Sequence, residues 1–193
     1  MFGIERIHIT ESGLGSRMEM AMEHEGLLNS IYREIFRTLA PGEIITRVAK
    51  ESVLSRYDHL EGIDVILTTQ DGVRMTLQEK VLTYHRDTLT VELEKNSGKK
   101  GAWYYCTAQY YFVGYNRKYV RDRKNNPIQF DNWILVDFAM LKWEAINNNV
   151  PWNDVKQNQH ENRRSTFQHV DFDNIPLNCV LARKTVKNYT LFD

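Results

Sequence analysis

The stretch GIDVILTTQDGVRMTLQEKV, residues 62–81, decides the fold that the sequence predicts. Two runs rich in apolar and β-branched residues, 63–69 and 73–84, flank a short polar turn at residues 70–72 that ends in glycine. This composition is typical of an antiparallel β-hairpin. The second strand nevertheless carries Gln-Glu-Lys in its middle, at residues 78–80. These polar side chains either lie on a solvated face or form a site.

Alternation along the strands separates the polar residues of the hairpin. Gln78 and Lys80 should point to one face of the sheet and Glu79 to the other, unless a bulge shifts the register. Counting outward from the turn pairs Asp64 with Gln78. The sequence therefore predicts that Asp64, Gln78 and Lys80 converge on one face, with Glu79 as an ion-pair partner on the opposite face.

Further carboxylates are available to this group. A third predicted strand, residues 89–94, alternates leucine and valine with threonine and glutamate, and contributes Glu92 or Glu94 if it lies nearby. Glu34, near the edge of the apolar stripe of the first predicted helix, is a further candidate, and Glu23 and Glu25 compete with it for that role. Carboxylate and amide oxygens suit Mg²⁺, and a nearby lysine can stabilise charge that develops at a phosphate.

These residues resemble the motif of the PD-(D/E)xK nuclease superfamily, in which an acid on one strand precedes acid-x-Lys on the next. Here Gln78, a neutral amide, stands at the position of the second acid, which resembles the Gln-x-Lys strands of phage and prophage nuclease-like proteins. The similarity covers roughly residues 16–138. It implies that Asp64 binds a metal, that Lys80 is the catalytic lysine, and that Gln78 replaces an acidic ligand, with Glu34, Glu92 or Glu94 compensating.

The whole chain of 193 residues is expected to form a single α/β domain, a mixed β-sheet flanked by helices with a restriction-endonuclease-like core. Residues 1–16 are expected to form an arm, 16–138 the core, and 139–193 a C-terminal helix and strand extension. A first helix is predicted over residues 18–42, whereas residues 43–62 are ambiguous between helix and irregular chain.

The expected function is a Mg²⁺- or Mn²⁺-dependent nuclease that hydrolyses DNA, either internally as an endonuclease or from an end. RNA stays open as a substrate. Two other functions stay open: a catalytically weak or inactive nuclease-fold protein that binds nucleic acid or a protein partner, and a structural or interaction protein in which the polar residues of 64–94 form a buried ion-pair network. The net charge of zero gives no global preference for nucleic acid. Two basic turns are nevertheless predicted to contact phosphates, through Lys99, Lys100, Arg117, Lys118 and Arg121.

Aromatic residues cluster around the second half of the predicted sheet, between Trp103 and Tyr115. They are either a platform for unpaired bases or part of the core, and alternation favours the core, as it does for Trp143. Cys106 and Cys179 lack a CxxC partner and are predicted to be reduced, buried thiols of a cytoplasmic protein. No run of residues is long and apolar enough to predict a membrane span, and a homodimer is one of the oligomeric states left open.

Overall fold

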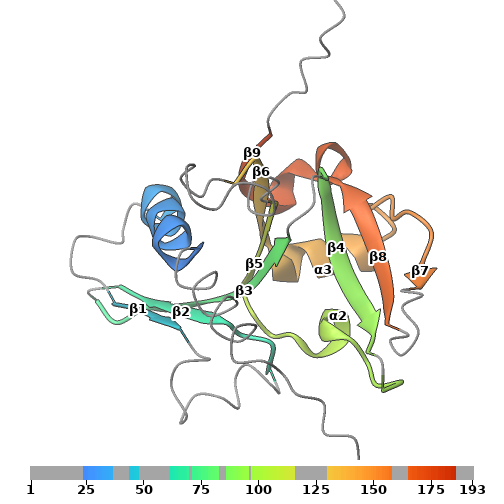
Figure 1. The fold of residues 1–193 in the computed structure, drawn as a ribbon, viewed down its shortest axis with the longest axis horizontal. Coiled ribbons are helices and arrows are strands. Elements are labelled where there is room, and N and C mark those ends of the chain that lie inside the picture. Colours follow the sequence, from blue (N-terminus) through green and yellow to red (C-terminus); the bar gives the residue numbers. More distant parts are fainter. Residues whose placement is uncertain are drawn as a thin grey trace, which may run out of the picture.

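A computed structural model describes residues 24–36, 44–47, 61–69, 71–82, 86–95, 97–115, 130–157 and 165–185. Their strands form two sheets, one of six strands and one of three (Figure 1). The predicted class, a mixed sheet with helices, is confirmed at this level.

The larger sheet has the strand order β1-β2-β3-β5-β6-β9. Only the neighbours β3 and β5 within it are parallel, and the other neighbours are antiparallel. The strands are β1 (Ile44–Arg47), β2 (Val65–Thr68), β3 (Arg74–Leu82), β5 (Tyr110–Tyr115), β6 (Asn132–Asp137) and β9 (Val180–Lys184). The predicted hairpin is β2 and β3, with Val65 opposite Leu77. Gly72 takes a φ of +83° in its turn, a conformation that favours glycine.

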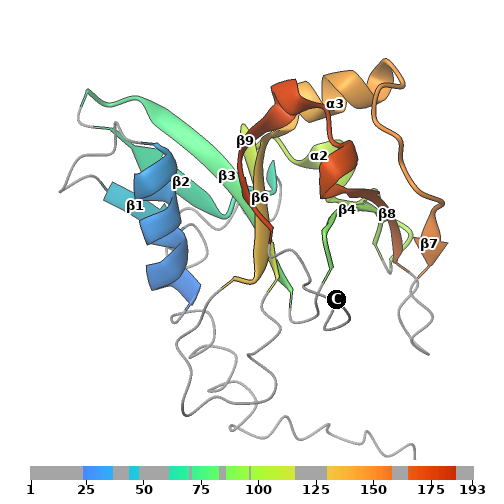
Figure 2. The ribbon, with the colours of Figure 1, turned by 90° about the horizontal axis from the view of Figure 1, so that it is seen from above.

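The smaller sheet has the order β4-β8-β7, with β4 (Thr88–Glu94), β8 (Thr166–Asp171) and β7 (Lys156–Gln157). The predicted third strand therefore leaves the hairpin and pairs with β8, a partner far along the chain. β4 and the short helix α2 (Ala102–Tyr105) together connect the parallel strands β3 and β5. Figure 2 shows β4 and β8 on one side of β3 and β6, and the N-terminal helix on the other.

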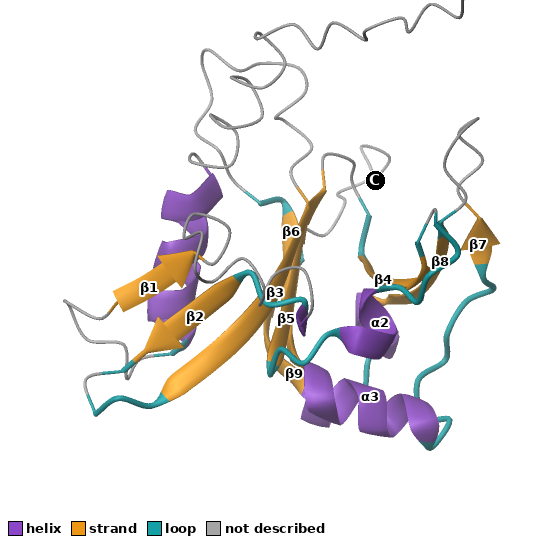
Figure 3. Cartoon of the chain, turned by 90° about the horizontal axis from the view of Figure 1, so that it is seen from below, coloured by secondary structure: helices purple, strands orange, loops and turns teal. Residues whose placement is uncertain are grey.

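The described part of the N-terminal helix covers residues 24–35, inside the predicted range. Figure 3 shows α3 (Phe138–Ile146) at the end of the molecule where α2 also lies. Asp137 caps α3 by accepting a hydrogen bond from the Met140 backbone N–H at 2.8 Å. Two 3₁₀ turns, η4 (Phe172–Asn174) and η5 (Leu177–Cys179), lead into β9.

Several short elements were not predicted, among them β1, α2, β7 and β9. β1 lies in the stretch that the sequence left ambiguous, α2 follows the predicted basic turn at Lys99 and Lys100, and β7 and β9 lie in the predicted C-terminal extension. Each has at most five residues, too few for a periodic pattern to appear. Their positions depend on pairing and packing with distant parts of the chain.

Each face of the larger sheet buries its own hydrophobic core. Leu28, Ile31 and Tyr32 of the N-terminal helix pack with Leu77 and Phe112 on one face. The other face packs against β4, β8 and α3; its buried residues include Tyr111, Val113, Ile134, Val136, Leu89, Val91, Phe138, Leu141 and Val170. Because successive strand residues alternate between these cores, the two faces of β3 have different neighbours.

Among the described residues, no helix combines the length and the apolar character needed to span a membrane.

Candidate functional site

The predicted pairing of Asp64 with Gln78 is present in the structure. The Asp64 backbone N–H donates to the Leu77 carbonyl at 2.8 Å, directly beyond the last ladder pair of β2 and β3, Val65 with Leu77. The Gln78 side-chain Nε2 then donates to Asp64 Oδ2 at 2.5 Å, and the Glu79 backbone N–H donates to the same oxygen at 2.6 Å. Two donors therefore fix the Asp64 carboxylate, which is half-buried at the start of β2.

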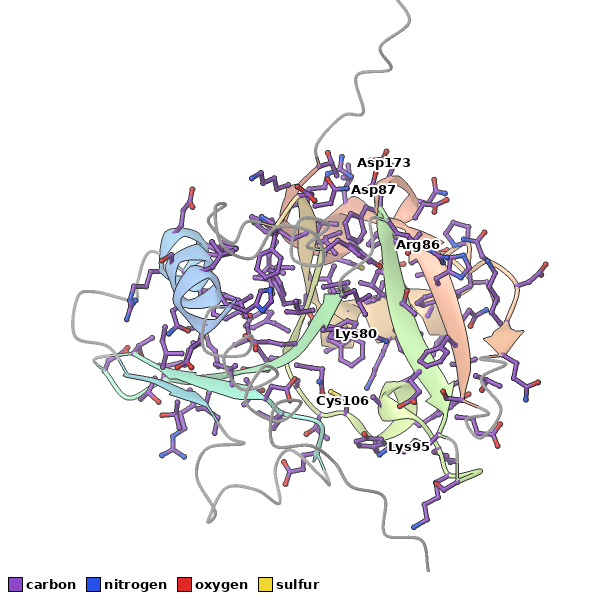
Figure 4. All side chains as sticks on the ribbon, viewed as in Figure 1. Lys80, Arg86, Asp87, Lys95, Cys106 and Asp173 are labelled. Atoms are coloured by element: carbon purple, nitrogen blue, oxygen red, sulfur yellow. The ribbon has the colours of Figure 1, made fainter. Side chains whose placement is uncertain are left out.

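Lys80 projects toward the smaller sheet (Figure 4). Its Nζ lies 5.0 Å from the centroid of the Phe167 ring on β8, and Phe167 is paired with Glu92 on β4. Burial lowers the pKa of the Lys80 ammonium, while the Glu92 carboxylate acts in the opposite direction. Glu92 thus approaches Lys80 from the second sheet, as predicted for a carboxylate of the third strand.

Two side chains that the sequence did not single out adjoin this group. The Tyr111 hydroxyl donates to the Thr90 carbonyl at 2.9 Å, and burial raises the pKa of Tyr111 well above its ordinary value. The carboxylates of Asp64 and Glu92 both raise it further, so both lie within electrostatic reach of Tyr111. The sequence did not predict that Tyr111 lies beside Asp64 and Glu92, because an aromatic residue in a strand indicates only a core position.

Cys106 is the second neighbour that was missed. Its Sγ donates to the Gly62 carbonyl at 3.1 Å and lies 3.9 Å from Gln78 Oε1. Burial raises the pKa of the Cys106 thiol. Cys106 and Cys179 are both buried and neither forms a disulfide, as predicted. Cys106 therefore faces the amide oxygen of Gln78, while Asp64 faces the amide nitrogen.

Glu79 and Glu34 lie on the other side of the sheet. Glu79 Oε1 accepts a hydrogen bond from the Tyr32 hydroxyl at 2.6 Å, and β2 pairs with β3 without a register shift. Glu79 therefore points away from Gln78 and Lys80, as alternation predicts. Glu34 is exposed on the N-terminal helix, which covers the Glu79 face. The structure thus separates Glu34 from Asp64, Gln78 and Lys80.

The predicted phosphate-binding residues are only partly described. Lys99 and Lys100 are exposed in the turn between β4 and α2. Arg117, Lys118 and Arg121 lie outside the described residues.

The prediction that the aromatic residues are core holds for Tyr111, Phe112 and Tyr115, which are buried on β5. It is wrong for Tyr104 on α2, which is 56% exposed, and for Trp143 on α3, which is 57% exposed. On each of these helices a different aromatic side chain turns inward: the Trp103 and Phe138 rings pack with their centroids 5.6 Å apart.

The donor set fits a hard divalent cation in part. Asp64 and Glu92 supply carboxylates, the ligands that Mg²⁺ and Mn²⁺ prefer. Gln78 turns its Nε2 toward Asp64, so its amide must rotate by a half-turn before Oε1 could join them. Within the described residues, no group of three or more His, Cys, Asp or Glu side chains is arranged to hold a metal ion. Any such ion would need water and phosphate oxygens as further ligands.

Comparisons of this chain with protein-family models, with curated proteins and with solved structures find no match.

Proposed function

We propose that this protein is a Mg²⁺- or Mn²⁺-dependent nuclease that hydrolyses phosphodiester bonds of DNA, with a restriction-endonuclease-like core. The observation that carries the proposal is the convergence of Asp64, Gln78 and Lys80 on one face of the β2–β3 hairpin. Glu92 completes the group from a different sheet. Polar side chains of this kind, half-buried between two sheets, have a cost in stability that a function would explain.

In this proposal Asp64 and Glu92 would hold the cation, and a cation bound there would lower the pKa of a coordinated water and polarise the phosphate. Gln78 keeps the Asp64 carboxylate in place through the 2.5 Å hydrogen bond, and the Glu79 backbone N–H supports it from the neighbouring residue. Lys80 supplies a positive charge next to the scissile phosphate and stabilises the charge that develops on its oxygens. Phe167 shields the Lys80 ammonium from water, which strengthens that interaction.

A second candidate function is nucleic-acid binding without cleavage. The orientation of Gln78 favours it, because Nε2 donates to Asp64 in the manner of a structural hydrogen bond. A neutral amide also supplies less charge to a cation than the carboxylate usual at this position in the resembled superfamily. Calorimetric titration with Mg²⁺ and Mn²⁺ separates the two candidates, because only the nuclease requires the metal.

The test is cleavage of single-stranded and double-stranded DNA by the purified chain with Mg²⁺ or Mn²⁺. Asp64→Asn and Lys80→Met should each lower the cleavage rate by roughly 10²-fold or more. Glu34→Gln is the matched control, since it neutralises an exposed carboxylate on the far side of the sheet and should leave the rate unchanged. Cleavage that persists in Asp64→Asn, or no cleavage by the unaltered chain with either metal, contradicts the proposal.

A further inference from the structure

A segment after β4, of which the structure describes residues 95 and 97–105, connects the two sides of the candidate site. It begins directly after β4, which carries Glu92, and it is followed by Cys106, whose Sγ faces Gln78. Its first half is a tight turn, in which the Lys95 backbone N–H donates to the Lys99 carbonyl at 2.8 Å. Its second half is helix α2. In Figure 4, Lys80 lies between β3 and β4, and Lys95 lies at the end of β4 near α2.

Backbone contacts fix this segment against β4. The Gly101 N–H donates to the Leu93 carbonyl at 2.8 Å, and Lys100 forms a β-bridge with Glu94. A side chain at position 101 would bring its Cβ to 2.3 Å from the Glu92 carbonyl oxygen, so only glycine allows this approach. Trp103 packs edge-on against Phe138 and Trp152, at centroid distances of 5.6 and 5.4 Å. The segment therefore holds a defined position relative to Glu92.

The outer surface of the segment combines lysines with an exposed tyrosine. Lys95, Lys99 and Lys100 occur in it without any acidic residue. Tyr104 is 56% exposed, and Lys100 Nζ lies 5.6 Å from the centroid of its ring. Lys95 Nζ lies 4.4 Å from the ring of Tyr105. Lysines beside an exposed aromatic ring are the combination with which proteins bind the phosphates and unpaired bases of single strands.

We propose that Tyr104 stacks on an unpaired base of single-stranded DNA while Lys99 and Lys100 bind the adjacent phosphates. The inference rests on the proposed function, and it names the substrate as single-stranded DNA or a single-stranded end. A base within a duplex already stacks on both of its faces, so Tyr104 can contribute binding energy only where a base is unpaired. Along the chain the segment lies between Glu92 on β4 and Cys106, whose Sγ lies 3.9 Å from Gln78 Oε1.

The experiment measures equilibrium binding by fluorescence anisotropy, with EDTA present so that no metal-dependent cleavage occurs. The probes are labelled single-stranded DNA of about 12 nucleotides and a duplex of the same sequence. Tyr104→Ala should weaken single-strand binding by about five- to 100-fold, the loss expected for one stacked base, and should change duplex binding little. Tyr104→Phe should keep the affinity, because it keeps the ring.

Two further variants complete the experiment. Lys99→Ala combined with Lys100→Ala should weaken binding and should reduce the slope of log affinity against log salt by about 0.7 per lost contact. Trp143→Ala is the matched control, because it removes an equally exposed aromatic ring from α3 and should leave binding unchanged. Circular dichroism of each variant checks that the fold is intact.

The inference is overturned if Tyr104→Ala binds the single strand as tightly as the unaltered chain. It is also overturned if single-strand and duplex affinity fall equally, or if single-stranded RNA binds more tightly than DNA. The nuclease proposal fails separately. Absence of cleavage with Mn²⁺, together with binding that depends on Tyr104, overturns the nuclease and supports the single-strand platform.

Discussion

Replacing Gln78 with glutamate introduces an acid at the position where the PD-(D/E)xK motif, which the hairpin resembles, has one, and it tests the geometry of the site directly. In the structure Gln78 Nε2 donates to Asp64 Oδ2 at 2.5 Å. Gln78→Glu removes that charge-assisted hydrogen bond, worth about 1.5–3 kcal/mol. It also places two carboxylates together, which repel by about 4 kcal/mol at a separation of about 4 Å and an effective dielectric constant of about 20.

Both side chains are half-buried, so solvent screens part of the repulsion. We expect the metal-free variant to lose about 3–5 kcal/mol of unfolding free energy near pH 7.5. The loss should shrink in acid. The new carboxyl of Gln78→Glu lies next to the Asp64 carboxylate, which raises its pKa in the folded chain. In the unfolded chain the pKa of glutamate is about 4.3. The destabilisation is therefore absent below that pH and grows as the pH rises through it.

Divalent metal should reverse the loss. A second carboxylate is a stronger ligand than an amide, so Mn²⁺ should stabilise Gln78→Glu more than the unaltered chain. Metal at 100 times its dissociation constant contributes about 2.7 kcal/mol.

Urea unfolding near pH 5 and pH 7.5, with and without Mn²⁺, measures these differences. Gln157→Glu, the same change at an exposed position on β7, is the control and should alter neither stability nor the response to Mn²⁺. Equal stability of Gln78→Glu and the unaltered chain at the higher pH without metal would refute the Asp64–Gln78 contact. Destabilisation that Mn²⁺ does not reverse would refute a metal site at this contact.

Two further predictions concern residues away from the proposed chemistry. Tyr32→Phe removes the hydroxyl that donates to Glu79 Oε1 at 2.6 Å, and should cost about 1.5–3 kcal/mol in urea unfolding while leaving cleavage unchanged. A loss of cleavage at unchanged stability would instead place Glu79 in the site. Hydrogen bonds from Asn149 and Asn178 lower the pKa of Glu144 below its ordinary 4.5. Their contribution to stability is present above that pH and is lost as the pH falls through the lowered pKa, so stability should fall less steeply with acid in Glu144→Gln. Thermal unfolding across the acid range checks this, and parallel curves would contradict it.

The sequence by itself determined the hairpin and the division of its side chains between two faces. Both follow from local rules, because a short turn sets the register and alternation then assigns every side chain of β2 and β3 to a face. The contact between Asp64 and Gln78 and the opposite direction of Glu79 could therefore be predicted from the spacing of residues along the chain.

Only the tertiary structure decided which other groups join this contact. β4 pairs with β8, which lies far along the chain, and this pairing brings Glu92 to Lys80 from a second sheet. The N-terminal helix covers the opposite face and takes Glu34 away. Cys106 and Tyr111 reach the site because β3 and β5 pair in parallel across a long connection.

The exposure of Tyr104 was likewise beyond the sequence. The four residues of α2 are too few to show the helical period in the sequence. The inward direction of Trp103 depends on its packing against Phe138 and Trp152. Local spacing thus fixed the central pair of the candidate site, whereas long-range strand pairing and helix packing chose the side chains that surround it.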